Sequence, residues 1–193
     1  MIDIQKEIEK KFPNINKKDN FLKKSLFKVA KKIVHEDSIN QFLTQNAHLK
    51  GFEFVDAVLD YFDFDYTVSS SDLQNIPSSG KVVIIANHPL GGLDALCLLR
   101  LISQVRKDVK IVANDFLAGF ESLNSLLIPI DNYKLRQSKN DIKKIYEALN
   151  NEEAIILFPA GEVSRATPKG IKDPAWNKGF LNFAQNSNAP ILP

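Results

Sequence analysis

The chain has 193 residues, of which 44% are hydrophobic and 25% charged, with only 8 glycines and 9 prolines. This composition is typical of one folded globular chain with a sizeable core, and it excludes disordered, collagen-like and low-complexity proteins. The single cysteine, Cys97, allows neither an internal disulfide nor a multi-cysteine zinc site, and we interpret it as a core residue.

The formal net charge of +2 is unevenly distributed along the chain. Residues 1–34 contain ten lysines and four acidic residues and so carry +6, whereas the remainder carries −4. Apolar residues recur at helical spacing between the lysines of residues 21–34, which predicts a basic amphipathic helix. We expect this helix either to pack on the fold with its lysines in water or to dock on an anionic membrane surface. A nucleic-acid partner is not indicated.

No stretch of the sequence approaches the roughly 18 to 20 apolar residues that a membrane-spanning helix needs. The N-terminus also lacks the basic start, apolar run and cleavage site of a secretory signal, so we expect a cytoplasmic protein. Two further helices are predicted, one from Ser38 and one over about residues 52–62. Residues 1–63 are therefore predicted to form a helical N-terminal segment, and residues 64–193 a second domain.

The pattern changes after Phe62. Alternation over residues 62–68 predicts a half-buried strand, and residues 69–80 are predicted to be a loop. Further strands are then predicted at residues 81–86, 109–113, 126–130, 154–158 and 189–193. They alternate with helices at residues 93–105, from about 116, at 141–149 and at 177–185, with a long loop after residue 158. This alternation predicts an α/β domain with a mainly parallel sheet flanked by helices. The last segment is typical of a buried strand that is just beginning, so we interpret the chain as truncated at its C-terminus.

The densest chemical signal is ANHPLGGLD, residues 86–94, which follows a predicted buried strand. Ligands bind at the carboxyl ends of strands in open α/β sheets. Gly91 and Gly92 let the loop fold back, so that Asp94 can reach the imidazole of His88. A histidine oriented by a carboxylate can act as a general base when the substrate supplies a hydroxyl. The alternative is that Asp94 only caps a helix and His88 is an ordinary loop residue.

The second signal is FPAGEVSR, residues 158–165, which also leaves a predicted buried strand. Gly161 allows close backbone approach, and Glu162, Ser164 and Arg165 place a carboxylate, a hydroxyl and a guanidinium within a short turn. Arginine can hold a phosphate or another anionic headgroup through two parallel hydrogen bonds. The alternative is a solvated loop with a surface arginine.

Together these segments resemble the glycerolipid or lysophospholipid acyltransferases, of the 1-acylglycerol-3-phosphate acyltransferase type. The resemblance extends from about residue 62 to the end of the chain, in four blocks that follow the family's order. Asn87 and His88 with Asp94 resemble the first block, residues 112–131 the second, residues 158–165 the third and residues 189–193 the fourth.

Two departures indicate which branch of the family the chain resembles. Five residues rather than four separate His88 from Asp94, and Ala160 stands where the family usually has glutamate. Both features resemble the haemolysin-like bacterial branch, whose members are linked to acylation of lyso forms of amino-acid lipids as well as phospholipids. The branch label implies no pore formation.

The resemblance implies an O-acyltransferase that moves a fatty acyl group from acyl-carrier protein or acyl-CoA to the hydroxyl of a lysophospholipid or lyso-amino-acid lipid. His88 is then the general base and Asp94 orients it, without an acyl-enzyme, a cofactor or a metal. The substrate-binding residues would be Asn87, Gly91, Gly92, Gly161, Glu162, Ser164 and Arg165.

Such an enzyme would act in phospholipid biosynthesis, as a peripheral protein on the cytoplasmic face of the cell membrane. Two other functions are compatible with the same residues. One is a hydrolase of thioesters or lipid esters, and the other is a noncatalytic membrane-binding domain of a larger protein.

Overall fold

The structure is a computed structural model that describes residues 35–114, 117, 119–130, 138–168 and 170–193. The chain forms two compact units, residues 1–48 and residues 49–193. In the first unit the structure describes helix α3 (Glu36–Gln45). This helix begins two residues before the predicted cap Ser38, and His35, with a left-handed φ of 55°, occupies the N-cap position. The predicted basic helix at residues 21–34 lies outside the described residues.

The second unit is built on a five-stranded sheet with the order β3-β2-β4-β1-β7. Every neighbouring pair in this sheet is parallel, which confirms the predicted α/β fold with a mainly parallel sheet. Its strands are β1 (Val82–Ile85), β2 (Val109–Asn114), β3 (Leu127–Ile130), β4 (Ala154–Leu157) and β7 (Ile191–Leu192). All residues of β1 and β4 are buried, as expected for apolar, largely β-branched strands that are covered on both faces.

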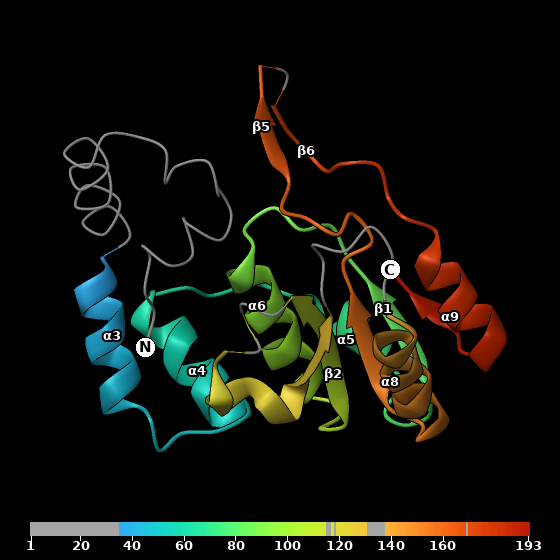
Figure 1. Cartoon of the computed structure of the whole chain (residues 1–193), viewed down its shortest axis with the longest axis horizontal. Helices are drawn as coiled ribbons and strands as arrows, with labels where there is room; N and C mark the ends of the chain where they lie inside the picture. Colours follow the sequence, from blue (N-terminus) through green and yellow to red (C-terminus); the bar gives the residue numbers. More distant parts are fainter. Residues whose placement is uncertain (1–34, 115–116, 118, 131–137, 169) are drawn as a thin grey trace. The chain divides into compact units, whose positions relative to one another are not determined.

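Helices cover both faces of this sheet, with α4 and α6 on one side and α8 and α9 on the other (Figure 1). Their bounds are α4 (Phe52–Tyr61), α6 (Gly92–Ser103), α8 (Lys139–Asn150) and α9 (Gly179–Ser187). Alternate strand residues, such as Val83 and Ile85, join Leu149 of α8 and Ala184 of α9 in one core cluster. Helix α4, which we predicted as part of the N-terminal segment, packs on α6 within the second unit. None of the described helices is long and apolar enough to cross a membrane.

The predicted strand at residues 62–68 is wrong, because the structure assigns no strand there. Helix α4 instead ends in a Schellman motif. The N–H of Phe64 donates to the carbonyl of Leu59 and the N–H of Asp63 to that of Asp60, with Asp63 at a φ of 48°. An extended segment with alternating residues follows this turn, but no neighbouring strand pairs with it in the described part of the chain.

Four other local predictions need correction. The predicted loop at residues 69–80 contains a short helix, α5 (Ser70–Gln74), capped by the hydroxyl of Ser69. Of the helix predicted from about residue 116, the described residue Leu117 is helical, whereas Glu121–Leu126 form the 3-10 helix η2. The long loop after residue 158 contains a hairpin of β5 (Arg165–Thr167) and β6 (Gly170–Lys172). Strand β7 is an edge strand rather than a buried one, since Ile191 remains 37% exposed.

A buried arginine fixes the amino-terminal edge of the sheet. The side chain of Arg106 is 1% exposed, and its guanidinium binds both carboxylate oxygens of Asp108 at 2.7 Å. Its remaining N–H groups donate to the carbonyls of Pro77, Gly80 and Glu152 at 2.7 to 3.1 Å. All five donors are therefore satisfied, as a buried guanidinium requires. This network joins segments that precede β1, β2 and β4. It therefore lies at the opposite edge of the sheet from the two motif segments, residues 86–94 and 158–165.

Candidate functional site

The sheet order brings together the two loops that the sequence motifs occupy. Strands β1 and β4 are adjacent and parallel, with Ile85 opposite Leu157, so both chains leave the sheet at the same edge. The ring of His88, from the first loop, stacks on that of Phe158, from the second, with centroids 3.9 Å apart and planes 16° apart. The backbone N–H of Ser164 donates to the carbonyl of His88 at 2.8 Å. The first and third blocks therefore form one site.

Asp94 both caps helix α6 and approaches the imidazole. Its Oδ2 accepts hydrogen bonds from the backbone N–H groups of Leu90 at 2.7 Å and Gly91 at 3.1 Å. The same oxygen lies 3.2 Å from Nδ1 of His88, and the two side chains are only 13% and 16% exposed. The alignment of this last contact falls short of a hydrogen bond, so here Asp94 acts on His88 chiefly through its charge. Hydrogen bonds of this kind often tighten only when substrate binds.

The loop geometry explains why glycine stands at position 91. Gly91 has φ 74° and ψ −126°, a conformation that residues with a side chain rarely adopt. A Cβ at this position would also lie 3.4 Å from Cγ2 of Val163. Gly91 thus lets the two loops approach each other closely while Asp94 folds back toward His88.

Burial favours the neutral form of the His88 imidazole. Burial lowers the pKa of His88 below its usual 6.5, although the carboxylates of Asp94 and Asp173 oppose this shift. The neutral form can accept a proton at the nitrogen that lacks one. Because Nδ1 faces Asp94, Nε2 is the nitrogen left to take a proton from a substrate.

Asp173 is a residue that sequence reasoning missed. Its carboxylate accepts the hydroxyl of Ser164 and, at 3.0 Å, the indole N–H of Trp176. These hydrogen bonds, with one from the backbone N–H of His88, lower the pKa of Asp173. The hairpin register pairs Arg165 with Lys172, so the residues just outside that pair, 164 and 173, face each other. Recognition of the hairpin from the sequence would therefore have found this carboxylate.

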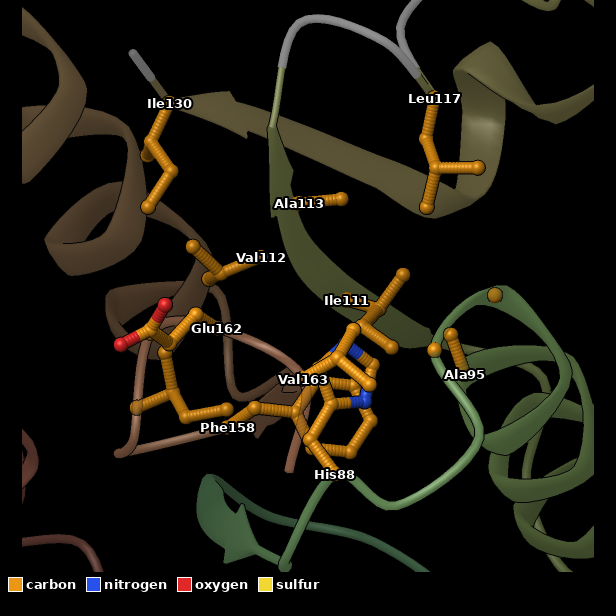
Figure 2. A pocket seen from close by; sticks show the side chains of 14 residues that line it. His88, Ala95, Ile111, Val112, Ala113, Leu117, Ile130, Phe158, Glu162 and Val163 are labelled. Carbon is orange, nitrogen blue, oxygen red and sulfur yellow. The ribbon is translucent and has the colours of Figure 1, made fainter. Parts of the chain in front are cut away.

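A pocket of about 240 Å³ opens beside His88. Figure 2 shows the stacked rings of His88 and Phe158 at one part of its wall and the carboxylate of Glu162 at another. Most of the remaining wall is apolar. It comes from β2, β3, the ends of β4 and α6, and the segment between β2 and η2, namely Ala95, Ile111, Val112, Ala113, Leu117, Ile130 and Leu157. The pocket therefore joins a general base to a surface that suits an apolar chain.

Four of the predicted substrate-binding residues line this pocket: Gly91, Gly92, Gly161 and Glu162. The other three, Asn87, Ser164 and Arg165, are not among the described lining residues. Asn87 is exposed beside His88, and Ser164 instead ties the carbonyl of His88 to Asp173. Arg165 is exposed and donates to both carboxylate oxygens of Glu162 at 2.8 Å.

Two further features concern the thiol of Cys97 and the side chains that could bind a metal ion. Burial raises the pKa of the Cys97 thiol, which keeps it protonated and agrees with its interpretation as a packing residue. Among the described residues, no group of three or more histidine, cysteine, aspartate or glutamate side chains is placed to hold a metal ion.

Comparison with known proteins shows the family to which the chain belongs. The family model described as Acyltransferase matches residues 7–193. A lyso-glycine lipid O-acyltransferase of Phocaeicola vulgatus is 31% identical over 195 residues, which cover 100% of this chain and 67% of the relative. A lyso-glycine lipid O-acyltransferase of Bacteroides thetaiotaomicron is 30% identical over 194 residues, covering 100% of this chain and 69% of that protein. No solved structure matches the chain significantly. The length of the family match and the identity to these relatives show that the chain belongs to the acyltransferase family.

Proposed function

We propose that the chain transfers a fatty acyl group from acyl-carrier protein or acyl-CoA to the hydroxyl of a lysolipid, with His88 as general base. The observation that carries this proposal is the mostly buried His88, whose Nδ1 lies 3.2 Å from the carboxylate of Asp94, in the wall of a largely apolar pocket. The pocket wall suits a fatty acyl chain, and the imidazole supplies the proton acceptor that an attacking hydroxyl needs.

The proposed reaction needs no covalent enzyme intermediate. Nε2 of His88 removes the proton of the acceptor hydroxyl while that oxygen attacks the thioester carbonyl. Asp94 stabilises the imidazolium that forms. The tetrahedral intermediate then collapses, the carbon–sulfur bond breaks, and the leaving thiolate takes the proton from His88. The products are an ester and a free thiol.

The start of helix α6 is suited to stabilise the oxyanion of that intermediate. Gly92 is the first residue of the helix and lines the pocket. Backbone N–H groups at a helix N-terminus carry partial positive charge and favour a nearby anion. A Cβ at Gly92 would meet no atom within 4 Å, so the space beside this backbone is open to a substrate. We assign the oxyanion site to this turn.

For the acceptor, we favour a lyso-amino-acid lipid over a lysophospholipid. Two relatives that match the whole chain are lyso-glycine lipid O-acyltransferases, and the spacing from His88 to Asp94 resembles that of the haemolysin-like branch. Arg165 binds the carboxylate of Glu162 through two hydrogen bonds in the structure. The carboxylate of an amino-acid headgroup could take the place of Glu162 in the same geometry. Asn87 and Ser164 remain proposed as further contacts of this headgroup.

Such a lysolipid is held in a bilayer, so we place the enzyme on the inner face of the cell membrane, as a peripheral protein. The test of the function is an acyl-transfer assay with purified protein. Long-chain acyl-carrier protein and acyl-CoA are each offered with a lyso-glycine lipid and with lysophosphatidic acid. The variants are His88→Ala and, as a matched control, His48→Ala, which changes a histidine far from the motif segments in sequence.

We expect acylated lyso-glycine lipid with wild-type protein and His48→Ala, and a loss of about 10²- to 10⁴-fold with His88→Ala, the usual contribution of a general base. Thiol release without any acceptor would instead identify a hydrolase. Transfer that persists in His88→Ala would refute the mechanism. Absence of both transfer and thiol release in folded, vesicle-bound wild-type protein would favour a noncatalytic membrane-binding domain.

A further inference from the structure

The β5–β6 hairpin is amphipathic and packs neither of its faces into the core. All described residues of the two strands are exposed. The register places Ala166 opposite Ile171, so these two apolar side chains share one face of the ribbon. Arg165 lies opposite Lys172, which puts two cations on the other face. An isolated two-stranded ribbon of this kind is marginally stable in water.

Exposed apolar side chains gather in the segments around the pocket mouth. Ile171 is the most exposed large apolar residue of the described chain, at 66%. Leu90 and Trp176 are 54% and 42% exposed, and Val163, at 44%, packs over the backbone of Gly91 in the pocket wall. Figure 1 shows the hairpin projecting from the edge of the sheet at which β1 and β4 end. The hairpin and the loops that border the pocket therefore carry several exposed large apolar side chains, and a binding role is one reason for such exposure.

We propose that the hairpin, together with Leu90, Val163 and Trp176, is the surface by which the protein docks on an anionic bilayer. The apolar face of the ribbon enters the acyl-chain boundary, and Lys172 meets the phosphate layer. Trp176 has the apolar ring and polar N–H of residues that settle at the interface between lipid and water. This inference rests on the proposed function, because docking in this way turns the pocket mouth toward the layer that holds the lysolipid.

Charge favours a lipid surface over a protein partner for this hairpin. Arg165 lies opposite Lys172, but its guanidinium is already paired with the carboxylate of Glu162, so Lys172 is the cation of the two that would meet an anionic headgroup. An anionic headgroup can pair with the ammonium group of Lys172, whereas the small apolar area of Ala166 and Ile171 is too little for a stable protein interface. The surface therefore fits phosphatidylglycerol-like lipids.

Trp176 allows a direct test because it is the chain's single tryptophan. The unmodified protein is mixed with phosphatidylglycerol vesicles whose acyl chains carry bromine near the headgroup, a quencher of indole fluorescence at short range. We expect quenching and a blue shift of the emission. A protein that sediments with these vesicles while Trp176 stays unquenched docks through another surface, which overturns the proposal. Absence of vesicle binding overturns it equally.

Matched substitutions test the two faces of the hairpin. Ile171→Ser removes the apolar anchor, and we expect about a tenfold weaker partition onto vesicles. Lys172→Gln should weaken partition about fivefold on phosphatidylglycerol and leave phosphatidylcholine binding unchanged. Phe62→Ser is the control, since Phe62 is also an exposed apolar residue, at 47%, but follows helix α4 rather than the pocket loops. An equal effect of Ile171→Ser and Phe62→Ser would contradict the assignment of this surface.

The same variants separate this inference from the proposed reaction. With a short-chain acceptor that is soluble as a monomer, Ile171→Ser should transfer acyl groups at the wild-type rate. With the acceptor in vesicles, the rate should fall in parallel with partition. If docking depends on Ile171 but His88→Ala retains transfer, the reaction mechanism is wrong and the docking surface stands. If His88→Ala abolishes transfer while Ile171→Ser behaves as wild type on vesicles, the docking surface is wrong and the reaction mechanism stands.

Discussion

Asp94→Asn is the substitution that most directly tests the proposed mechanism. It removes one negative charge 3.2 Å from Nδ1 of His88. Two opposite unit charges at that distance attract by about 5 kcal/mol at an effective dielectric constant of about 20. The charges are largely buried, so desolvation offsets part of this attraction. We therefore expect kcat to fall by about 10³-fold, within the roughly 10²- to 10⁴-fold range of general-base catalysis.

The fold should tolerate this change. An asparagine oxygen can still accept from the N–H groups of Leu90 and Gly91, so the loss in stability should be at most about 1 kcal/mol. Asp141→Asn is the matched control, because Asp141 occupies the same position in the first turn of α8, three residues after the cap Ser138. Steady-state kinetics and thermal unfolding of both variants are the measurements. A drop in kcat of less than tenfold for Asp94→Asn would mean that Asp94 only caps its helix.

The pH profile of Asp94→Asn gives an independent test of the role of the Asp94 carboxylate. The acid limb of kcat/KM in wild-type enzyme should have an apparent pKa below 6.5, because burial lowers the pKa of His88 and the base must be neutral. The Asp94 carboxylate raises that pKa, so its removal should move the acid limb to lower pH even as the rate falls. An acid limb that moves to higher pH, or does not move, would contradict the electrostatic role assigned to Asp94.

Two further predictions concern residues outside the His88–Asp94 pair. Asp173→Asn should also move the acid limb of kcat/KM to lower pH, because the Asp173 charge raises the pKa of His88; a lower rate with an unmoved limb would indicate a structural role alone. Arg106→Met leaves three backbone carbonyls without their donor and should cost about 3 to 5 kcal/mol of stability, which lowers Tm by roughly 10 °C; an unchanged Tm in calorimetry would refute this.

The central strands could be predicted because their sequences bury both faces. Residues 82–85 and 154–157 are continuous apolar runs, and the structure has each as a strand with every residue buried. Residues 62–68 alternate regularly between apolar and polar side chains, yet they form no strand. A strand needs a neighbouring strand for its backbone hydrogen bonds, and alternation in the local sequence does not supply one. The left-handed Asp63 that ends α4 carries no glycine signal, so its turn was not visible in the sequence.

The hairpin at residues 165–172 was missed for the opposite reason. All of its described strand residues are exposed, so it lacks the contrast of buried and exposed positions from which strands are recognised. Pro168 and Gly170 are residues typical of turns, but from the sequence we predict only a long loop after residue 158. Missing the hairpin also hid Asp173, whose place opposite Ser164 follows from the ladder register.

The site shows which relations are local and which are not. The approach of Asp94 to His88 depends on a short segment with two glycines, so the local sequence was enough to predict it. In the structure Asp94 both caps its helix and faces the imidazole. The stacking of His88 on Phe158 depends on β4 lying next to β1, although β2 comes between them in the chain. No local pattern contains that strand order.

The choice between transfer and hydrolysis depends on what reaches Nε2 of His88, since the same base can activate an alcohol or water. His88 is mostly buried, and its ring is covered by Phe158 on one face, so a proton donor must enter through the pocket mouth. Exposed apolar residues such as Val163 border that mouth. When they lie against lipid, a bilayer replaces water at the entrance, and a lysolipid hydroxyl becomes the nearest donor. Docking on a bilayer would then also favour transfer over hydrolysis. We therefore expect thiol release without an acceptor to be slower when the protein is bound to vesicles than when it is free in solution.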